Sequence, residues 1–122
     1  MSEQPTSTDF YTVRKIALSF PGVIEGTSYG TPAFRVGKKF LARLREDGDL
    51  VLKVGDVQSE FLIEAEPDIY YITDHYRGWG SVLIRLSQIR PVAFQYVFEE
   101  TWRQFASKRD IATYEAQGNT HE

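Results

Sequence analysis

The sequence of 122 residues predicts an α+β domain of two layers, in which helices cover one face of an antiparallel sheet. Apolar residues recur at helical spacing near both ends of the chain, whereas most segments between them alternate apolar and polar residues as strands do. The expected element order is α-β-β-β-α-β-β-α. Adjacent strands with so few helical crossovers favour an antiparallel sheet over a doubly wound parallel one.

The first helix is expected after the polar residues 1–8, which predict a disordered N-terminus. Thr8 or Asp9 can accept a hydrogen bond from a free N–H group at the helix start. Apolar side chains then recur at helical spacing: Phe10, Val13, Ile16, Ala17 and Phe20. Pro21 and Gly22 are expected to end this helix.

Alternating patterns predict five strands: 33–36, 39–45, 50–54, 69–72 and 82–86. Glycine-containing pairs at 37–38 and 47–48 suit tight turns between the first three strands, because glycine adopts positive φ at little cost. A short helix is expected at 57–65, with Asp56 as its cap and Pro67 beyond its end.

A closing helix is expected from Pro91, which suits the first helical position. Its apolar stripe consists of five residues: Phe94, Val97, Phe98, Trp102 and Phe105. The predicted domain spans 9–109, and 110–122 are expected to form a polar C-terminal tail in which Ile111 and Tyr114 can dock on the body.

Composition narrows the classes of function. The chain has no Cys, which excludes disulfides, thiol catalysis and Cys-type metal sites and favours a reducing compartment. It has neither a secretory signal pattern nor an apolar run of the ~18 residues that a membrane span needs. We therefore expect a cytoplasmic protein with no membrane contact.

Catalytic motifs are missing from the sequence. His75 and His121 are its only histidines, and His121 lies in the expected tail, so we expect no metal cluster. No serine lies in a nucleophile-elbow context, and the glycines match neither a phosphate-binding loop nor a dinucleotide fingerprint. We expect no enzyme activity and no cofactor.

Positive charge is predicted on one face of the sheet. The net charge is −3, but residues 31–56 carry six Lys or Arg against four Asp or Glu, and 77–109 carry six against two. Alternation assigns one apolar set to the buried face: Phe34, Val36, Phe40, Ala42, Leu44, Leu50, Leu52, Val54, Val82, Ile84 and Leu86. The opposite face then contains Arg35, Leu41, Arg43, Arg45, Val51, Lys53, Leu83 and Arg85, with five cations and no acid.

Three interpretations of that face remain open. Long cationic side chains can simply cover exposed strands, with their stems on apolar surface and their charged ends in water. The face can instead bind a polyanion, whose phosphates the cations would neutralise. In the third interpretation Leu41, Val51 and Leu83 form a contact with a protein partner or with a second copy of the chain.

The segment DHYRGWG, within the loop 73–81, has two interpretations. Trp79 can stack on a base or another flat ligand, and Arg77 can bind phosphate or carboxylate through two hydrogen bonds. Alternatively Tyr76 and Trp79 close the end of the core while Arg77 pairs with Asp74 or Asp68. We favour a mixture, in which the two aromatic residues mainly complete the core and Arg77 is the residue left for a ligand; the role of His75 stays open.

Several motifs together resemble the MmcQ/YjbR family of small bacterial proteins. They are FPGVIEGTSYGTPAFRVGKKFLARL, DHYRGWGSVLIRL and a last helix ending in Trp102, Ala106, Lys108 and Arg109. The resemblance covers residues 9–109. It implies a two-layer α+β fold of the YjbR type, similar in topology to type III secretion chaperones. Members are commonly labelled DNA-binding, but the family offers no catalytic or base-reading motif to carry over.

The function expected from the sequence is that of a non-enzymatic cytoplasmic binding protein for nucleic acid. The residues expected to contact the ligand are Arg35, Arg43, Arg45, Lys53 and Arg85, with Arg77 and Trp79 beside them. Binding should be weak, dependent on salt and tolerant of sequence, since phosphate contacts carry no sequence information. The alternative is a protein-interaction or chaperone-like module that dimerises or docks a partner on the same face.

Overall fold

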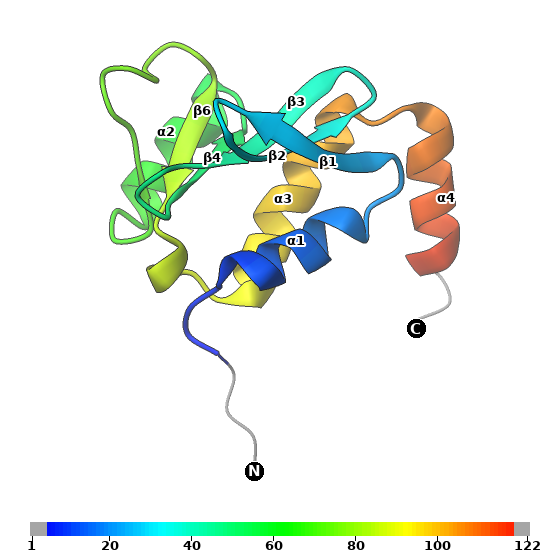
Figure 1. Ribbon diagram of the computed structural model, residues 1–122, viewed down its shortest axis with the longest axis horizontal. Helices are drawn as coiled ribbons and strands as arrows, with labels where there is room; N and C mark the ends of the chain where they lie inside the picture. The colour runs from blue at the N-terminus through cyan, green and yellow to red at the C-terminus, as the bar shows by residue number, and fades with distance from the viewer. Residues whose placement is uncertain (1–4, 119–122) are drawn as a thin grey trace.

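Six antiparallel strands form one sheet in the computed structural model, which describes residues 5–118 (Figure 1). In chain order they are β1 Val23–Ser28, β2 Thr31–Val36, β3 Lys39–Leu44, β4 Leu50–Lys53, β5 Tyr70–Tyr71 and β6 Ser81–Ile84. Across the sheet the order is β1-β2-β3-β4-β6-β5, and each neighbouring pair is antiparallel. The predicted α+β class with an antiparallel sheet is confirmed.

Helices cover one face of this sheet. Within the described residues they are α1 Phe10–Leu18, α2 Asp56–Ala65, α3 Pro91–Phe105 and α4 Lys108–Gly118, with a 3-10 turn, η1 Leu86–Gln88, after β6. Helices α1 and α3 contact each other below the sheet in Figure 1, and α3 contacts β3 and β4. Helix α2 packs instead against β5 and β6. We call the face of the sheet away from α1 and α3 the outer face.

The start of α1 agrees with its predicted cap. The carboxylate of Asp9 accepts a hydrogen bond from the backbone N–H of Thr12 at 2.8 Å. Thr8, however, is buried: its backbone N–H donates to the carbonyl of Leu86, and its hydroxyl donates to the carbonyl of Ile89 at 2.7 Å. The predicted disorder therefore does not extend to Thr8. Residues 1–4, which the same prediction covers, lie outside the described part of the chain.

Trp102 anchors α3 in the core, as its place in the apolar stripe predicts. Its side chain is fully buried, and its ring nitrogen Nε1 donates to the backbone carbonyl of Pro21 at 2.9 Å. The ring of Phe20 lies 5.2 Å from that of Trp102 and 5.5 Å from that of Phe98. This aromatic cluster fixes α3 against the end of α1.

Strand β1 lies where the sequence pattern predicts no strand. It pairs with β2 along its whole length, from Val23 opposite Val36 to Ser28 opposite Thr31. Only Val23 in β1 is buried, because β1 is an edge strand with few buried positions. A strand of this kind carries no alternation of apolar and polar residues, which is why the pattern missed it.

A bulge between β2 and β3 changes which side chains reach the core. Phe34 pairs with Ala42, but Arg35 pairs with Phe40, so Leu41 has no partner in the register. Leu41 and Ala42 are both fully buried in the core cluster, whereas Phe40 shares the outer face with Arg35. The predicted places of Phe40 and Leu41 are thus exchanged, and Leu41 is not part of the outer face.

Helix α4 replaces part of the predicted polar tail. Its Tyr114 ring packs 5.0 Å from the ring of Phe20 and 5.1 Å from that of Trp102, and its hydroxyl donates to the carboxylate of Glu99 at 2.8 Å. Ile111 also packs against the core, so the docking allowed by the sequence occurs through a helix. The tail residues 119–122, including His121, lie outside the described part of the chain.

Candidate functional site

The register of the central strands determines which side chains share the outer face. Arg43 of β3 lies opposite Val51 of β4, and Val51 lies opposite Leu83 of β6. Val51 and Leu83 are buried, although neither belongs to the core cluster under α1 and α3. The outer face therefore has a buried apolar strip of its own.

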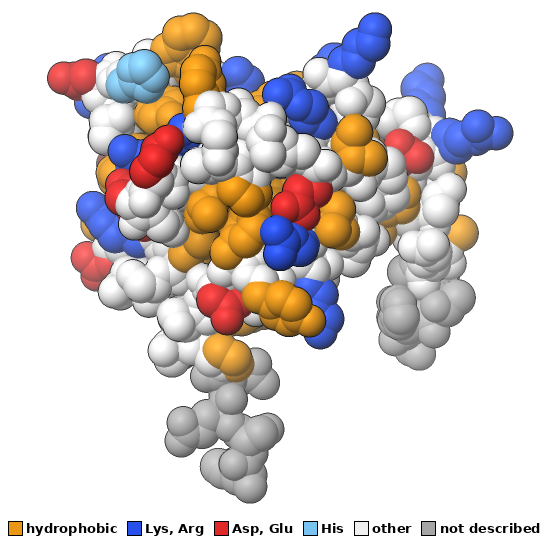
Figure 2. Space-filling view, viewed as in Figure 1, with side chains coloured by type: hydrophobic (Ala, Val, Ile, Leu, Met, Phe, Trp, Pro, Cys, Tyr) orange, Lys and Arg blue, Asp and Glu red, His pale blue; other side chains and the backbone are white. Residues whose placement is uncertain are grey.

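A hollow of about 380 Å³, which we call the aromatic hollow, opens on this face. Its lining comes from the β1–β2 turn, the central strands and the loop between β5 and β6: Tyr29, Phe40, Arg43, Val51, Lys53, His75, Tyr76, Trp79 and Ser81. None of these lining residues carries a carboxylate, and two are cations. Figure 2 shows hydrophobic side chains gathered beside a histidine over the loop between β5 and β6.

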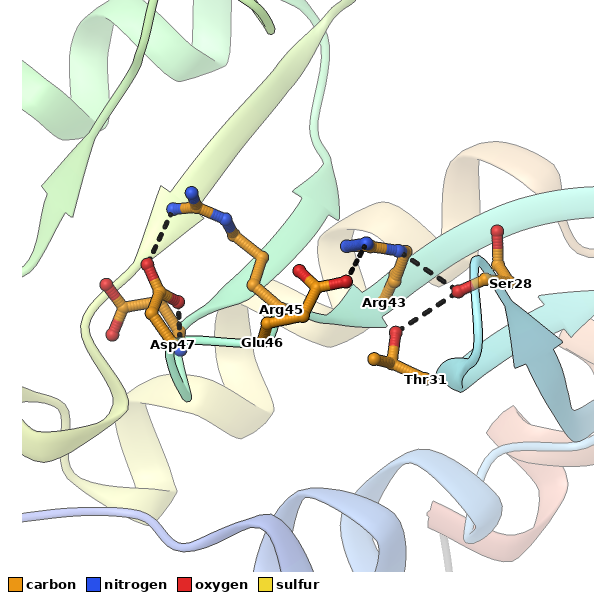
Figure 3. Close-up of polar contacts among 7 residues, drawn as sticks. Ser28, Thr31, Arg43, Arg45, Glu46 and Asp47 are labelled. Carbon is orange, nitrogen blue, oxygen red and sulfur yellow. Dashed lines mark hydrogen bonds and ion pairs between the residues drawn. The ribbon is translucent and has the colours of Figure 1, made fainter.

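Arg43 is the buried cation of the hollow, with 8% of its surface exposed. Its Nε donates to the carbonyl of Ser28 and its Nη2 to the carboxylate of Glu46, each at 3.2 Å (Figure 3). Its guanidinium carbon lies 5.3 Å from the centre of the Tyr29 ring. Nη1 is buried and has no hydrogen-bond partner among the described residues, so the fold leaves part of this guanidinium unsatisfied.

Tyr29 has a backbone conformation that its residue type disfavours. It occupies the two-residue turn between Ser28 and Thr31, with φ of +55° followed by +81° at Gly30, as in a type I′ turn. Among residues 5–118 it is the one non-glycine residue with positive φ, and its side chain is 87% exposed. Tyr29 is not among the site residues expected from the sequence, although a residue before glycine between two extended segments is a hairpin signal.

The loop between β5 and β6 places Trp79 at the hollow. Trp79 is 66% exposed, so the expectation that it completes the core is wrong. Its carbonyl accepts a hydrogen bond from Lys53 Nζ at 2.6 Å, which ties the loop to β4. Tyr76 is half-buried and meets the ring of His75 edge-on at 4.8 Å. The structure thus brings together three of the predicted site residues, Arg43, Lys53 and Trp79.

Arg45 and Arg85 lie away from the hollow, in a network around Tyr71. Arg45 Nη1 donates to the Tyr71 hydroxyl at 3.1 Å and forms an ion pair with Asp47 at 3.2 Å. The Tyr71 hydroxyl donates in turn to the carboxylate of Asp49. Burial, together with this neighbouring carboxylate, raises the pKa of Tyr71 to about 12. Arg45 is therefore occupied within the fold.

Arg85 completes the same network. Its guanidinium carbon lies 4.1 Å from the centre of the Tyr71 ring. Its Nη1 donates to the carbonyl of Pro67 at 3.1 Å and to that of Asp68 at 3.4 Å. These contacts hold the segment between α2 and β5, so Arg85 also has a structural task.

Arg35 and Arg77 differ in their surroundings. Arg35 lies over the ring of Phe40, 5.8 Å from its centre, and makes no ion pair with another described residue. Arg77 pairs with Asp74 at 3.4 Å and lines a separate hollow of about 620 Å³ beside α2, which also contains Asp56 and Glu60. Arg77 therefore belongs to an acidic neighbourhood rather than to the aromatic hollow.

Two kinds of feature are absent from residues 5–118. They contain no group of three His, Cys, Asp or Glu side chains placed to hold a metal ion. No helix within the same residues has the length and apolar composition to cross a membrane.

The fold and the hollow together define a small α+β protein with an aromatic, cationic pocket of a size found in ligand sites, on the outer face of its sheet. The chain belongs to the YjbR family, whose sequence model matches residues 18–104. That match includes all of the sheet and the whole aromatic hollow and ends before α4.

Two mycobacterial proteins and one solved structure are similar to this chain. The uncharacterized proteins Mb2600 of Mycobacterium bovis and Rv2570 of Mycobacterium tuberculosis are each 30% identical to it, over 66% of this chain and 78% of theirs. The crystal structure of Deinococcus radiodurans protein DR2400, with the domain DUF419, superposes with a TM-score of 0.68 over 89% of this chain and 88% of that one. At 19% identity, this likeness shows the fold alone.

Proposed function

We propose that this protein is a non-enzymatic, cytoplasmic binding protein whose ligand is nucleic acid, contacted through the outer face of the sheet. The observation that carries the proposal is the aromatic hollow, where Arg43 and Lys53 meet the exposed rings of Tyr29 and Trp79. Cations neutralise phosphates, and exposed aromatic rings stack on bases. A single strand offers both groups at every nucleotide.

The cations that serve this function are fewer than the sequence predicts. Arg35, Arg43 and Lys53 lie in or beside the hollow, whereas Arg45 and Arg85 are held by the network around Tyr71. We assign phosphate contacts to the first three. Arg45 and Arg85 add only to the surrounding positive field.

A salt-dependent binding experiment tests the proposal. The affinity of a labelled single-stranded oligonucleotide is measured by fluorescence anisotropy at several salt concentrations for the wild type and for Arg35→Gln with Lys53→Gln. Affinity should fall with salt, and loss of two phosphate contacts should reduce the log–log slope by about 1.4. The absence of binding to the wild type at low salt would refute the proposed function.

The matched control removes two cations elsewhere. Lys108 and Arg109 are exposed at the start of α4, outside the hollow. Lys108→Gln with Arg109→Gln makes the same change in net charge and should leave the salt slope unchanged. If both double variants lose the same slope, the ligand responds to net charge and the assignment to the outer face is wrong.

A protein-interaction role for the same face is the second candidate. Ile24 of the edge strand β1 is opposite Arg35 in the register and is 58% exposed, so apolar surface continues from the hollow towards the sheet edge. A dimer or a docked partner would cover it. Light scattering should then give twice the monomer mass, and Ile24→Asp should restore the monomer; a monomeric wild type would exclude the dimer.

A further inference from the structure

Two local costs of the fold coincide at the aromatic hollow. Tyr29 adopts a left-handed backbone conformation that is unfavourable for residues other than Gly, Asn and Asp. Its ring is exposed, so the fold gains little packing from it. Arg43 Nη1 is one of two buried side-chain polar atoms without a partner among residues 5–118. Unfavourable features of this kind concentrate at sites where a ligand makes the missing contacts.

The cationic donors of the hollow indicate the anionic part of a ligand. Arg43 uses Nε and Nη2 for contacts within the protein, so Nη1 is left to donate to an acceptor from outside. Lys53 has three N–H groups and uses one on the carbonyl of Trp79. Two cationic donors at one hollow, with no carboxylate in its lining, suit a phosphate or carboxylate oxygen.

The rings specify the remainder of the ligand. Tyr29 enters the lining from the β1–β2 turn and Trp79 from the loop between β5 and β6, and both are largely exposed. Phe40 and Tyr76 add apolar surface between the strands and that loop. A flat ring stacks well on surfaces of this kind. The volume of about 380 Å³ suits one ring with its attached group rather than several.

We propose that the aromatic hollow is a site for one unpaired nucleotide, with its base against Trp79 or Tyr29 and its phosphate at Arg43 and Lys53. This inference rests on the proposed function and narrows it to a preference for single strands. A base in a duplex is stacked on both faces and paired along its edge, so it cannot enter the hollow unless it flips out.

Intrinsic fluorescence provides a direct readout of the site. Trp79 is exposed whereas Trp102, the other tryptophan, is fully buried, so stacking of a base should quench the Trp79 signal and leave that of Trp102. The probes are a single-stranded oligonucleotide, its duplex, a strand of the same length with abasic sites, and adenosine monophosphate. Quenching per bound nucleotide is compared between adenosine monophosphate and the oligonucleotide. If adenosine monophosphate quenches at least as strongly, the site is assigned to free nucleotides; if it quenches more weakly, the site is assigned to a strand.

The expected result is binding of the single strand at least about tenfold tighter than binding of the duplex or the abasic strand. Trp79→Leu should remove that advantage, and Tyr96→Leu, which changes an exposed tyrosine of α3, should keep it. Equal affinity for all three strands without quenching would overturn the nucleotide site while leaving nucleic-acid binding intact. No binding of any strand would remove the proposed function as well.

Tyr29→Asn separates a ligand role from a structural one. Asn suits the left-handed position of a type I′ turn better than Tyr, so this variant should unfold at a higher temperature than the wild type. We expect it to bind the single strand about tenfold more weakly, since a stacking ring is lost. Unchanged affinity would remove Tyr29 from the site.

Discussion

Replacement of Arg43 by Met should abolish oligonucleotide binding while leaving the stability of the fold nearly unchanged. The variant loses the hydrogen bond from Nε to the carbonyl of Ser28, which contributes about 1.5–3 kcal/mol for a charged donor. It also loses the ion pair with Glu46, worth about 0–1 kcal/mol because the side chain of Glu46 is 70% exposed. The Ser28 carbonyl keeps a donor, the hydroxyl of Thr31 at 3.1 Å (Figure 3).

The same replacement also stabilises the fold, by an amount that nearly offsets the lost hydrogen bond and ion pair. Removing the buried, unpartnered Nη1 of Arg43 recovers about 1–3 kcal/mol, and Met supplies apolar atoms beside Val51 and Tyr29. The expected change in the free energy of unfolding is therefore within about 1 kcal/mol of zero. Urea unfolding followed by circular dichroism measures it.

Arg45→Met is the matched comparison, two residues along the same strand. Arg45 donates to the Tyr71 hydroxyl and pairs with Asp47, so its replacement removes satisfied contacts without relieving a buried donor. It should cost about 1.5–3 kcal/mol and, since Arg45 adds only to the surrounding field, weaken oligonucleotide binding far less than Arg43→Met does. A loss of more than about 3 kcal/mol in Arg43→Met would show that Arg43 is structural and would refute the reasoning.

Three further predictions test the fold. Leu41→Ala should cost about 2–5 kcal/mol in urea unfolding and Phe40→Ala clearly less, because the bulge buries Leu41; equal losses would contradict the register. Gly22→Ala should cost at least about 1 kcal/mol, since φ is +81° and a Cβ would collide with a carboxylate of α4; an unchanged unfolding midpoint would refute this. Burial raises the pKa of Tyr70 and of Tyr71 to about 12, so the contribution of these two side chains to stability should be constant below pH 10 and fall from pH 10 to about 12, as the unfolded chain ionises first; a flat profile in alkaline urea unfolding would contradict it.

Elements with a regular pattern were predictable from the sequence. The apolar stripe from Phe94 to Phe105 is present in α3, and the cap at Asp9 is present in α1, as expected, because a periodic apolar face and a capping carboxylate are local signals. Strand β1 and helix α4 lacked such signals. Most of α4 is polar, and it docks mainly through Ile111 and Tyr114, so its stability depends on packing that no local pattern encodes.

The exchange of Phe40 and Leu41 has a different cause. Both are apolar, so composition does not distinguish them. Alternation along 39–45 assumes that each residue pairs with one residue of the neighbouring strand. A bulge inserts one residue and reverses the count beyond it. The sequence contains no glycine there to mark the bulge, so alternation alone assigned Phe40 to the core in place of Leu41.

The candidate site was predictable in composition but not in geometry. Arg43, Lys53 and Trp79 were expected near a ligand and line one hollow. Arg45 and Arg85 were expected there too, but they do not line the hollow. Arg45 instead donates to the hydroxyl of Tyr71, and Arg85 lies over its ring. Tertiary packing decides whether an arginine has partners within the protein. A charge pattern therefore cannot distinguish an arginine that the fold already uses from one that can bind a ligand.

The two halves of the outer face therefore differ in whether their arginine N–H groups are available to a ligand, and not in their charge. Around Tyr71 each arginine reaches an acceptor within the protein, so this half stabilises the fold. At the aromatic hollow Nη1 of Arg43 lacks an acceptor, and Tyr29 has an unfavourable backbone conformation. These costs arise on β3 and in the β1–β2 turn, yet they meet at the same hollow. If they were accidents of folding, a variant that removed both would be more stable and would bind equally well; on our interpretation it gains stability and loses its ligand.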